Sequence, residues 1–183
     1  MELTCEEFRD YFVGVALGDG DLTHDRRGYR VRIVDASREY LETLSSQLEG
    51  CFGAKGKIYK VKTFSAYYLV VWRKDLYMLI KNNVERLLQS PTPAFVAGLI
   101  DAEAGVGRTD DGLYRLYFTN IRKAVIDAVA KVLDRYGIKY YLVNEKRRHR
   151  LYVHGIDRIK ALLDVIPAMH PKVRGRFLSL INR

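Results

Sequence analysis

The sequence of 183 residues predicts an α+β fold of two related halves, each with the order αββαββα. Three observations predict it: a repeat whose copies lie 84 positions apart, alternating helical and strand-like hydrophobic patterns, and a stripe of small residues on one helix of each copy. Hydrophobic residues make up 48% of the chain, enough for a substantial core. We expect a pseudo-twofold axis between the halves, with the striped helices packed at the centre.

The repeat is clearest in two segments, Phe12–Gly20 and Val96–Ala104. Glycine, a small residue and an acid recur at the same offset of 84 (98 − 14, 102 − 18 and 103 − 19). The same offset predicts that residues further along correspond as well: Val34 with Phe118, Leu48 with Val132, Gly53 with Gly137, Ile58 with Leu142, Tyr68 with Tyr152 and Leu69 with Val153.

In the first half, Thr4 followed by Glu7 forms a capping box for a helix over residues 4–18. A strand is expected at 29–34. A helix over 37–52, with leucines at helical spacing, stops at Gly53. Strands at 57–62 and 66–73 form a hairpin, and Leu76, Leu79 and Ile80 indicate a closing helix.

In the second half, the order is a helix at 93–102, a strand at 113–119, a helix at 121–136, strands at 138–144 and 148–154, and a helix at 156–165. A short strand follows the first helix of each half. An extra helix at about 171–182 has no counterpart. We expect an N-terminal half at 1–88, a linker at 89–93 that contains Pro91 and Pro93, and a C-terminal half at 94–183.

The composition limits the functions to consider. Net charge is +9, with 31 Lys and Arg against 22 Asp and Glu, which favours nucleic acid as a partner. No apolar run is long enough to span a membrane, and the acidic start does not resemble a signal peptide. We therefore expect an intracellular, cytoplasmic protein associated with the nucleoid. Cys5 and Cys51 are too few for a disulfide framework and are expected to be reduced thiols.

The small residues indicate chemistry at two helix ends. Gly14 and Gly18 share one helix face, and Gly98 and Ala102 share another, so the two backbones can approach closely. Such contact would bring Asp19 and Glu103 together. Two facing carboxylates repel unless a proton or a cation lies between them. Oxygen ligands of this kind suit Mg²⁺, which can promote hydrolysis of a phosphodiester.

These residues also carry a resemblance to a known family. The segment Ala97-Gly-Leu-Ile-Asp-Ala-Glu103 resembles the signature of LAGLIDADG homing endonucleases, with Glu for Asp at the last acid. The first copy, Phe12–Gly20, is more degenerate, because Ala16 and Leu17 replace the usual Ile-Asp. The resemblance covers nearly the whole chain and implies a saddle-shaped antiparallel sheet surface, with the motif helices at its centre.

The resemblance implies roles for named residues. Asp19 and Glu103 would ligate catalytic Mg²⁺, with main-chain carbonyls at Gly18 and Ala102, and Mn²⁺ or Ca²⁺ could substitute for binding. Lys172 follows a proline at the start of the extra helix and is the candidate for stabilising the transition state or for orienting water. The first half has Leu88 at the matching position, so the two sites are expected to be unequal.

Alternating basic and apolar residues predict a DNA-binding sheet face. In residues 29–34 and 148–154, basic and polar side chains fall on one face and valine, isoleucine and leucine on the other. One conflict is left open: offset 84 aligns Arg32 with Leu116, so either the hairpin register differs between the halves or one face assignment is wrong. The candidate DNA contacts are Arg30, Arg32, Lys57, Lys60, Lys62, Arg115, Tyr117, Arg148, Arg150, Tyr152 and His154.

The predicted function is a monomeric, intron-encoded homing endonuclease. It would make a double-strand break in a long, non-palindromic DNA site by metal-dependent hydrolysis, and the family resemblance implies 3′ overhangs. The alternative is a binder on the same scaffold that does not cut, either an intron RNA maturase or a transcription regulator. A regulator of that kind commonly loses the motif acids, whereas both are kept here.

Overall fold

Each half of the chain repeats the same order of helices and strands in the computed structural model, which describes residues 3–63, 65–110, 112–171 and 175. The first half contains α1 (Cys5–Gly18), β1 (Gly20–Asp25), β2 (Gly28–Asp35), α2 (Arg38–Phe52), β3 (Lys57–Lys60), β4 (Tyr67–Trp72) and α3 (Lys74–Gln89). The second contains α4 (Pro93–Glu103), β5 (Ala104–Arg108), β6 (Tyr114–Asn120), α5 (Lys123–Arg135), β7 (Tyr141–Glu145), β8 (Arg148–His154) and α6 (Ile156–Val165).

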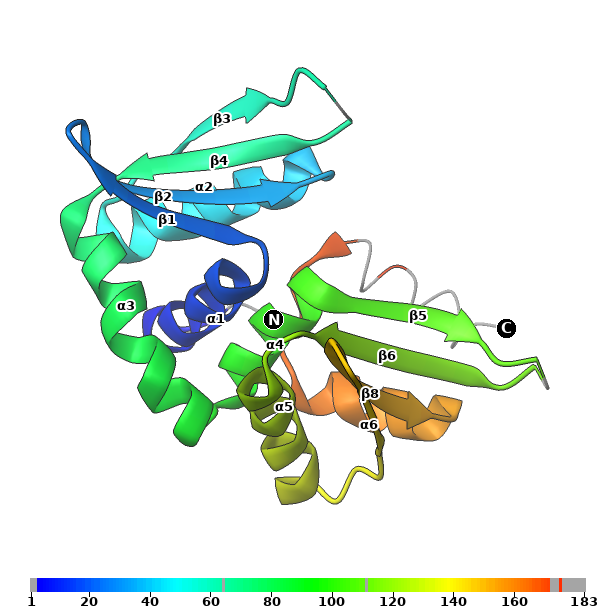
Figure 1. Cartoon of the computed structure of the whole chain (residues 1–183). Helices are drawn as coiled ribbons and strands as arrows, with labels where there is room; N and C mark the ends of the chain where they lie inside the picture. Colours follow the sequence, from blue (N-terminus) through cyan, green and yellow to red (C-terminus); the bar gives the residue numbers. More distant parts are fainter. Residues whose placement is uncertain (1–2, 64, 111, 172–174, 176–183) are drawn as a thin grey trace.

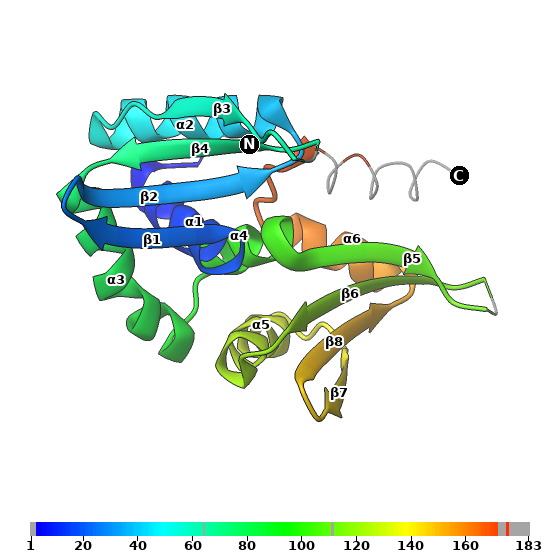
Figure 2. The ribbon, with the colours of Figure 1, turned by 45° about the horizontal axis from the view of Figure 1, so that its top comes forward.

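The strands form two antiparallel sheets of the same topology, which confirms the predicted fold class. Their orders are β1-β2-β4-β3 and β5-β6-β8-β7. The two sheets lie on either side of α1 and α4, which occupy the centre of the molecule (Figures 1 and 2). In the described part of the chain, no helix is long and apolar enough to cross a membrane. The predicted extra helix at about 171–182 lies almost wholly outside the described residues.

Local signals in the sequence set several helix ends. The Thr4 side chain accepts from the Glu7 backbone and the Glu7 side chain accepts from the Thr4 backbone, so the predicted capping box is present. Gly53 and Gly137, just after α2 and α5, have φ of 60° and 65°, a conformation that glycine adopts without strain. The closing helix α3 is longer than the leucine pattern predicts and runs from Lys74 to Gln89.

The small-residue stripes let the backbones of α1 and α4 touch. A Cβ atom on Gly14 would lie 2.2 Å from the Phe95 carbonyl oxygen, and one on Gly98 would lie 2.1 Å from the Tyr11 carbonyl oxygen. The two contacts are reciprocal, as a pseudo-twofold axis requires. Phe12, Phe95 and the other apolar residues around the stripes are fully buried, so the motif helices form the centre of the core as predicted.

The offset of 84 does not hold along every strand. Gly20 pairs with Ile33, and its counterpart Ala104 pairs with Phe118, so Ile33 and Phe118 correspond although they are 85 positions apart. Ile33 and Phe118 pair in turn with Leu69 and Leu151, which are 82 apart. The predicted correspondences of Val34 with Phe118, Tyr68 with Tyr152 and Leu69 with Val153 are therefore wrong.

The cause is a change in the length of three connections. The β5–β6 connection is one residue longer than its first-half counterpart, the stretch from β6 to β7 is one residue shorter, and the β7–β8 hairpin is two residues shorter. Ile58 and Leu142 therefore correspond at 84, because the first two changes cancel before β7. The open conflict over Arg32 is settled in favour of a different register: its counterpart is Tyr117, and the counterpart of Arg30 is Arg115.

The expectation of two reduced thiols is also wrong, because Cys5 and Cys51 form a disulfide. Cys5 begins α1 and Cys51 lies in the last turn of α2. The two helix ends meet at the edge of the core, where the Phe8 and Phe52 rings stack with centroids 6.1 Å apart. The Cα atoms of the cysteines are consequently only 5.3 Å apart, although 46 positions separate them in the sequence.

We predict that Gly98→Ala destabilises the protein by about 3 kcal/mol or more, because its Cβ would collide with backbone atoms that cannot move aside. The matched control is Gly50→Ala in α2, where a Cβ meets nothing within 4 Å. That change should instead stabilise the helix, by up to about 1 kcal/mol. Thermal unfolding of both variants measures the difference, and equal melting temperatures would contradict the backbone contact.

The disulfide predicts a second stability effect. Replacing both cysteines by serine should lower the free energy of unfolding by about 2–4 kcal/mol, because the cross-link restricts the unfolded chain. A reducing agent should lower the urea midpoint of the natural protein and leave that of the double variant unchanged. Alkylation of the unreduced, denatured protein at two thiols would show instead that the cysteines are not joined.

Candidate functional site

The ends of the two central helices bring the predicted carboxylates together. α1 ends at Gly18, with Asp19 as its C-cap residue, and α4 ends at Glu103. A Cβ on Gly18 would lie 2.6 Å from the Ala102 Cβ, 3.2 Å from the Glu103 Cγ and 3.8 Å from the Glu103 Oε1. The Glu103 carboxylate therefore lies over Gly18, next to Asp19, and a larger residue at position 18 would displace it.

The two carboxylates are electrostatically unfavourable in this setting. Burial, followed by the charges of Glu103 and Asp35, raises the pKa of Asp19 from 3.8 to about 7, while His170 opposes the shift. Burial also raises the pKa of Glu103. Among the residues that the structure describes, neither acid forms an ion pair with Lys or Arg. A cation bound between them would offset this unfavourable charge.

The donor set fits a hard divalent cation better than a soft one. Within the described ranges, no group of three or more His, Cys, Asp or Glu side chains could hold a metal ion, so a zinc-like cage is absent there. Mg²⁺ usually takes only one or two carboxylates and completes its coordination with water and substrate phosphate. Asp19 and Glu103 meet that requirement. The carbonyls of Gly18 and Ala102 stay predicted ligands, and Lys172 lies outside the described residues.

Two residues at the strand ends flank the carboxylates, and sequence reasoning missed both. Asp35 ends β2 and Asn120 ends β6, and the strand registers make them counterparts. The Asn120 side-chain amide donates to Glu103 Oε1 at 3.4 Å. On the other side, the Val34 amide beside Asp35 donates to the Asp19 carbonyl at 3.2 Å. Offset 84 hid the correspondence, because it aligns Asp35 with Thr119.

A buried hydrogen-bond network lies among the same elements. Asp101 Oδ2 accepts from the Tyr11 hydroxyl at 2.7 Å, from the Met169 amide at 2.7 Å and from the His170 amide at 3.0 Å. The Tyr11 and Tyr40 hydroxyls are 2.7 Å apart. The network ties α1, α2, α4 and the segment after α6 to one another. Burial raises the pKa of Asp101, and these hydrogen bonds oppose the rise.

The first sheet presents three of its five predicted basic residues on the face opposite the core. Arg30 and Arg32 point away from buried Val31 and Ile33, and both guanidinium groups pair with Asp21, at 3.2 and 3.1 Å. They lie over aromatic rings of β4, Arg30 over Trp72 and Arg32 over Tyr68. Lys57 is on this face, because it pairs with Val70 opposite Arg32; Lys60 is on the other face, and Lys62 lies beyond the end of β3.

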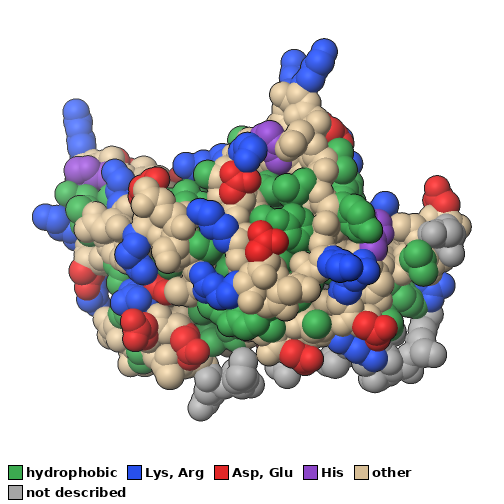
Figure 3. Space-filling model, turned by 90° about the horizontal axis from the view of Figure 1, so that it is seen from below, with side chains coloured by type: hydrophobic (Ala, Val, Ile, Leu, Met, Phe, Trp, Pro, Cys, Tyr) green, Lys and Arg blue, Asp and Glu red, His purple; other side chains and the backbone are tan. Residues whose placement is uncertain are grey.

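The second sheet repeats this arrangement with different side chains. Arg115 and Tyr117 lie on the face opposite buried Leu116 and Phe118, and their partners on β8 are His154 and Tyr152. The Arg115 guanidinium lies over the Tyr152 ring. Arg150 lies on the same face as Arg115. Arg150 and Arg148, which begins β8 at the hairpin, both form ion pairs with Glu145. Seen from below, the molecule shows Lys and Arg side chains among acidic and apolar ones, with basic tips projecting at the rim (Figure 3).

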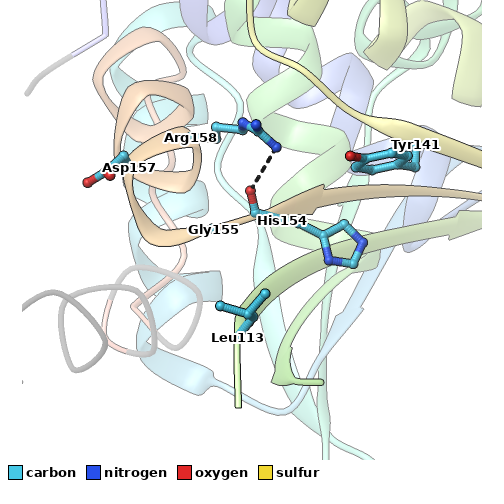
Figure 4. Close-up of a pocket in the computed structure, with 6 residues that line it drawn as sticks. All are labelled: Leu113, Tyr141, His154, Gly155, Asp157 and Arg158. Carbon is cyan, nitrogen blue, oxygen red and sulfur yellow. Dashed lines mark hydrogen bonds between the residues drawn. The ribbon is translucent and has the colours of Figure 1, made fainter. Parts of the chain in front are cut away.

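A hollow at the outer end of the second sheet is separate from the carboxylates. It is lined by His154 and Gly155, where β8 passes into α6, and by Leu113, Tyr141, Asp157 and Arg158 (Figure 4). Arg158 donates to the His154 carbonyl at 3.5 Å. His154 pairs with Arg115 at the far end of β6, whereas Asn120 beside Glu103 ends that strand. The hollow therefore lies a strand length away from the acids.

The pKa of Asp19 leads to a prediction for the metal-free protein. Since the pKa is about 7 in the folded state and 3.8 without burial, ionising Asp19 destabilises the folded state as pH rises through this range. Asp19→Asn removes that cost, so its stability gain over the natural protein should be small near pH 4 and largest above pH 7. Melting temperatures in EDTA measure the gain. Asp164→Asn on the exposed face of α6 is the control, and a gain independent of pH would contradict the prediction.

Comparisons with known proteins agree with this geometry. Residues 91–167 match the family model of the LAGLIDADG-like domain, and residues 8–81 match that of the WhiA LAGLIDADG-like domain. The chain is 32% identical over 165 residues to the homing endonuclease I-DmoI of Desulfurococcus mucosus, and the match covers 82% of each protein.

Solved structures give the same result. A crystal structure of I-DmoI in complex with DNA and Mn matches 91% of this chain and 99% of its own, with a TM-score of 0.71 and 27% identity. Full-length DUF199/WhiA from Thermatoga maritima shares the fold at a TM-score of 0.67 and 16% identity, over 98% of this chain and 62% of its own. With its two halves, its paired motif acids and its match to I-DmoI, the chain belongs to the LAGLIDADG homing endonuclease family.

Proposed function

We propose that this protein is a divalent-metal-dependent DNA endonuclease that cuts both strands of a long duplex site. One observation carries the proposal. The motif helices touch through their backbones and place Asp19 and Glu103 side by side, with no Lys or Arg paired to either among the described residues. Such a pair of acids raises the free energy of the folded protein unless it binds a cation, so its presence is accounted for by metal binding.

The metal is proposed to be Mg²⁺, with Mn²⁺ or Ca²⁺ able to take its place in binding. Structures of I-DmoI or its variants with DNA contain Mn, Mg or Ca, which supports a divalent ion here. When bound, such an ion polarises a phosphate and activates water for hydrolysis. Asp19 and Glu103 would hold it, while Gly18 and Ala102 leave room for the two acids to meet and offer their carbonyls.

The sheet faces are proposed to bind the DNA. The arginines whose guanidinium groups lie over aromatic rings are held in place by these contacts, and planar guanidinium groups suit both phosphates and guanine edges. Each face carries a different set, because the counterpart of Arg32 is Tyr117 and that of Trp72 is His154. Two unlike faces would read two unlike half-sites. We therefore propose a monomer that recognises a non-palindromic site and leaves 3′ overhangs, encoded within an intron.

A second candidate is a LAGLIDADG protein that binds nucleic acid without cutting. The match of residues 8–81 to the WhiA LAGLIDADG-like domain supports it. A transcription regulator and an intron RNA maturase are two forms of this alternative. The presence of both acids favours the nuclease, because a protein that only binds gains nothing from two repelling carboxylates at its centre.

Cleavage can be tested without knowing the natural site. The protein would first select bound sequences from a pool of random duplexes in Ca²⁺, and plasmids carrying them would then be incubated with Mg²⁺ or Mn²⁺. We expect linear plasmid from the natural protein. Asp19→Asn and Glu103→Gln should remove cleavage and keep binding of the same duplex, because neither acid is needed for the sheet contacts. Asp164→Asn is the matched control and should cut normally.

Three results would contradict the proposal. Undiminished cutting by both acid variants would show that these carboxylates are not the metal ligands. Specific binding by the natural protein, with no cutting in either metal, would favour the second candidate. Cutting that persists in EDTA would show that the reaction needs no divalent ion.

A further inference from the structure

The chain segment that follows α6 leaves the second half and contacts the first (Figure 1, orange to red). It contains His170, which is 4% exposed. The His170 ring packs on Tyr40 of α2, with centroids 4.4 Å apart, and its Nε2 lies 3.0 Å from Asp35 Oδ2. The Met169 and His170 amides are fixed on Asp101, so the segment is held from both sides.

His170 fixes a carboxylate next to the predicted metal ligand of the first half. Asp35 Oδ1 accepts from the Ser37 amide at the start of α2, and Oδ2 contacts His170, so both oxygens have partners. The neighbouring Val34 amide donates to the Asp19 carbonyl, which places Asp35 against the end of α1. Asp35 and His170 both lie close enough to Asp19 to affect its pKa, which Asp35 raises and His170 lowers.

The second half has a different arrangement at the corresponding place. Asn120, the counterpart of Asp35, donates its amide to Glu103 and accepts from the Arg122 amide. An ionised carboxylate only accepts hydrogen bonds, whereas an amide both donates and accepts. A water bound near Asp19 would therefore meet a carboxylate, and one bound near Glu103 would meet an amide. The two sites would thus differ in how they orient an attacking water.

We propose that His170 is a positioning residue of the first half's site, which holds the Asp35 carboxylate beside Asp19 and so sets the rate at which one of the two DNA strands is cut. The proposal rests on the proposed function. Asp35 is the group that would accept a hydrogen bond from water at that site, and His170 acts through it. The second half's site, with Glu103 and Asn120, would cut the other strand without help from His170.

The experiment measures the two strands separately. A duplex selected as above carries a different label on each strand, and cutting by His170→Ala is compared with the natural protein under single-turnover conditions in Mg²⁺. We expect cutting of one strand to slow by about 10–100-fold, which is typical when a residue that supports the groups around a metal site is removed. The other strand should change by less than about threefold, so nicked duplex should accumulate.

Three further variants separate positioning from loss of structure. His170→Gln keeps a donor toward Asp35 and should restore most of the lost rate. Asp35→Asn should slow the same strand, and adding His170→Ala to it should have little further effect, because both act through one contact. His24→Ala, an exposed histidine stacked on Tyr29, is the control and should leave the strand ratio unchanged.

The outcomes are distinguishable. Equal slowing of both strands by His170→Ala, or an unchanged strand ratio, overturns the inference and leaves the nuclease function standing. Additive effects of the Asp35 and His170 changes overturn it as well. A natural protein that binds the duplex and cuts neither strand overturns the proposed function, and this inference with it. If His170→Ala melts below the assay temperature, the comparison of His170→Gln with Asp35→Asn decides.

Discussion

The direct contact of two helix backbones is the constraint on which the rest of this structure depends. Gly14 against Phe95 and Gly98 against Tyr11 leave no space for even one methyl group, so α1 and α4 are in a single fixed register. That register places the helix ends together and, with them, Asp19 and Glu103. It also fixes where the two sheets begin, because β1 follows the end of α1 and β5 follows the end of α4. A close-packed interior transmits such a constraint with little loss.

The contact brings an electrostatic cost that the surrounding residues limit but do not remove. Burial and mutual repulsion disfavour ionised Asp19 in the metal-free protein. Asp101 receives three hydrogen bonds, from α1 and from the segment after α6, whereas Glu103 accepts one from Asn120 among the described residues. The three carboxyl groups thus have different roles. Asp101 joins the halves through its hydrogen bonds, whereas Asp19 and Glu103 can bind a ligand.

Local patterns in the sequence predicted local structure well. The capping box, the terminal glycines and the small-residue stripes determine helix ends and helix contacts over a few residues, so those predictions were confirmed. Alternation along a strand also fixes which face each side chain takes, whatever the hairpin length. An offset carried across several hairpins is less robust, because one added or two missing residues shift the later strands. Asp35 with Asn120, and Cys5 with Cys51, came together only in three dimensions.

The three changes in connection length explain how the halves differ and still share a fold. A strand that slips by one residue against its partner turns all its side chains to the opposite face. Here the extra residue lies in the β5–β6 connection, so β6 keeps its pairing and its core side chains still face the core. The core side chains Ile33 and Phe118 thus keep equivalent places. On the opposite face, the same shift sets tyrosine where the first half has arginine. The scaffold therefore holds its helices and its acids in symmetry, while its outer face and the neighbours of the acids are free to differ. An enzyme that must read two unlike half-sites needs that combination.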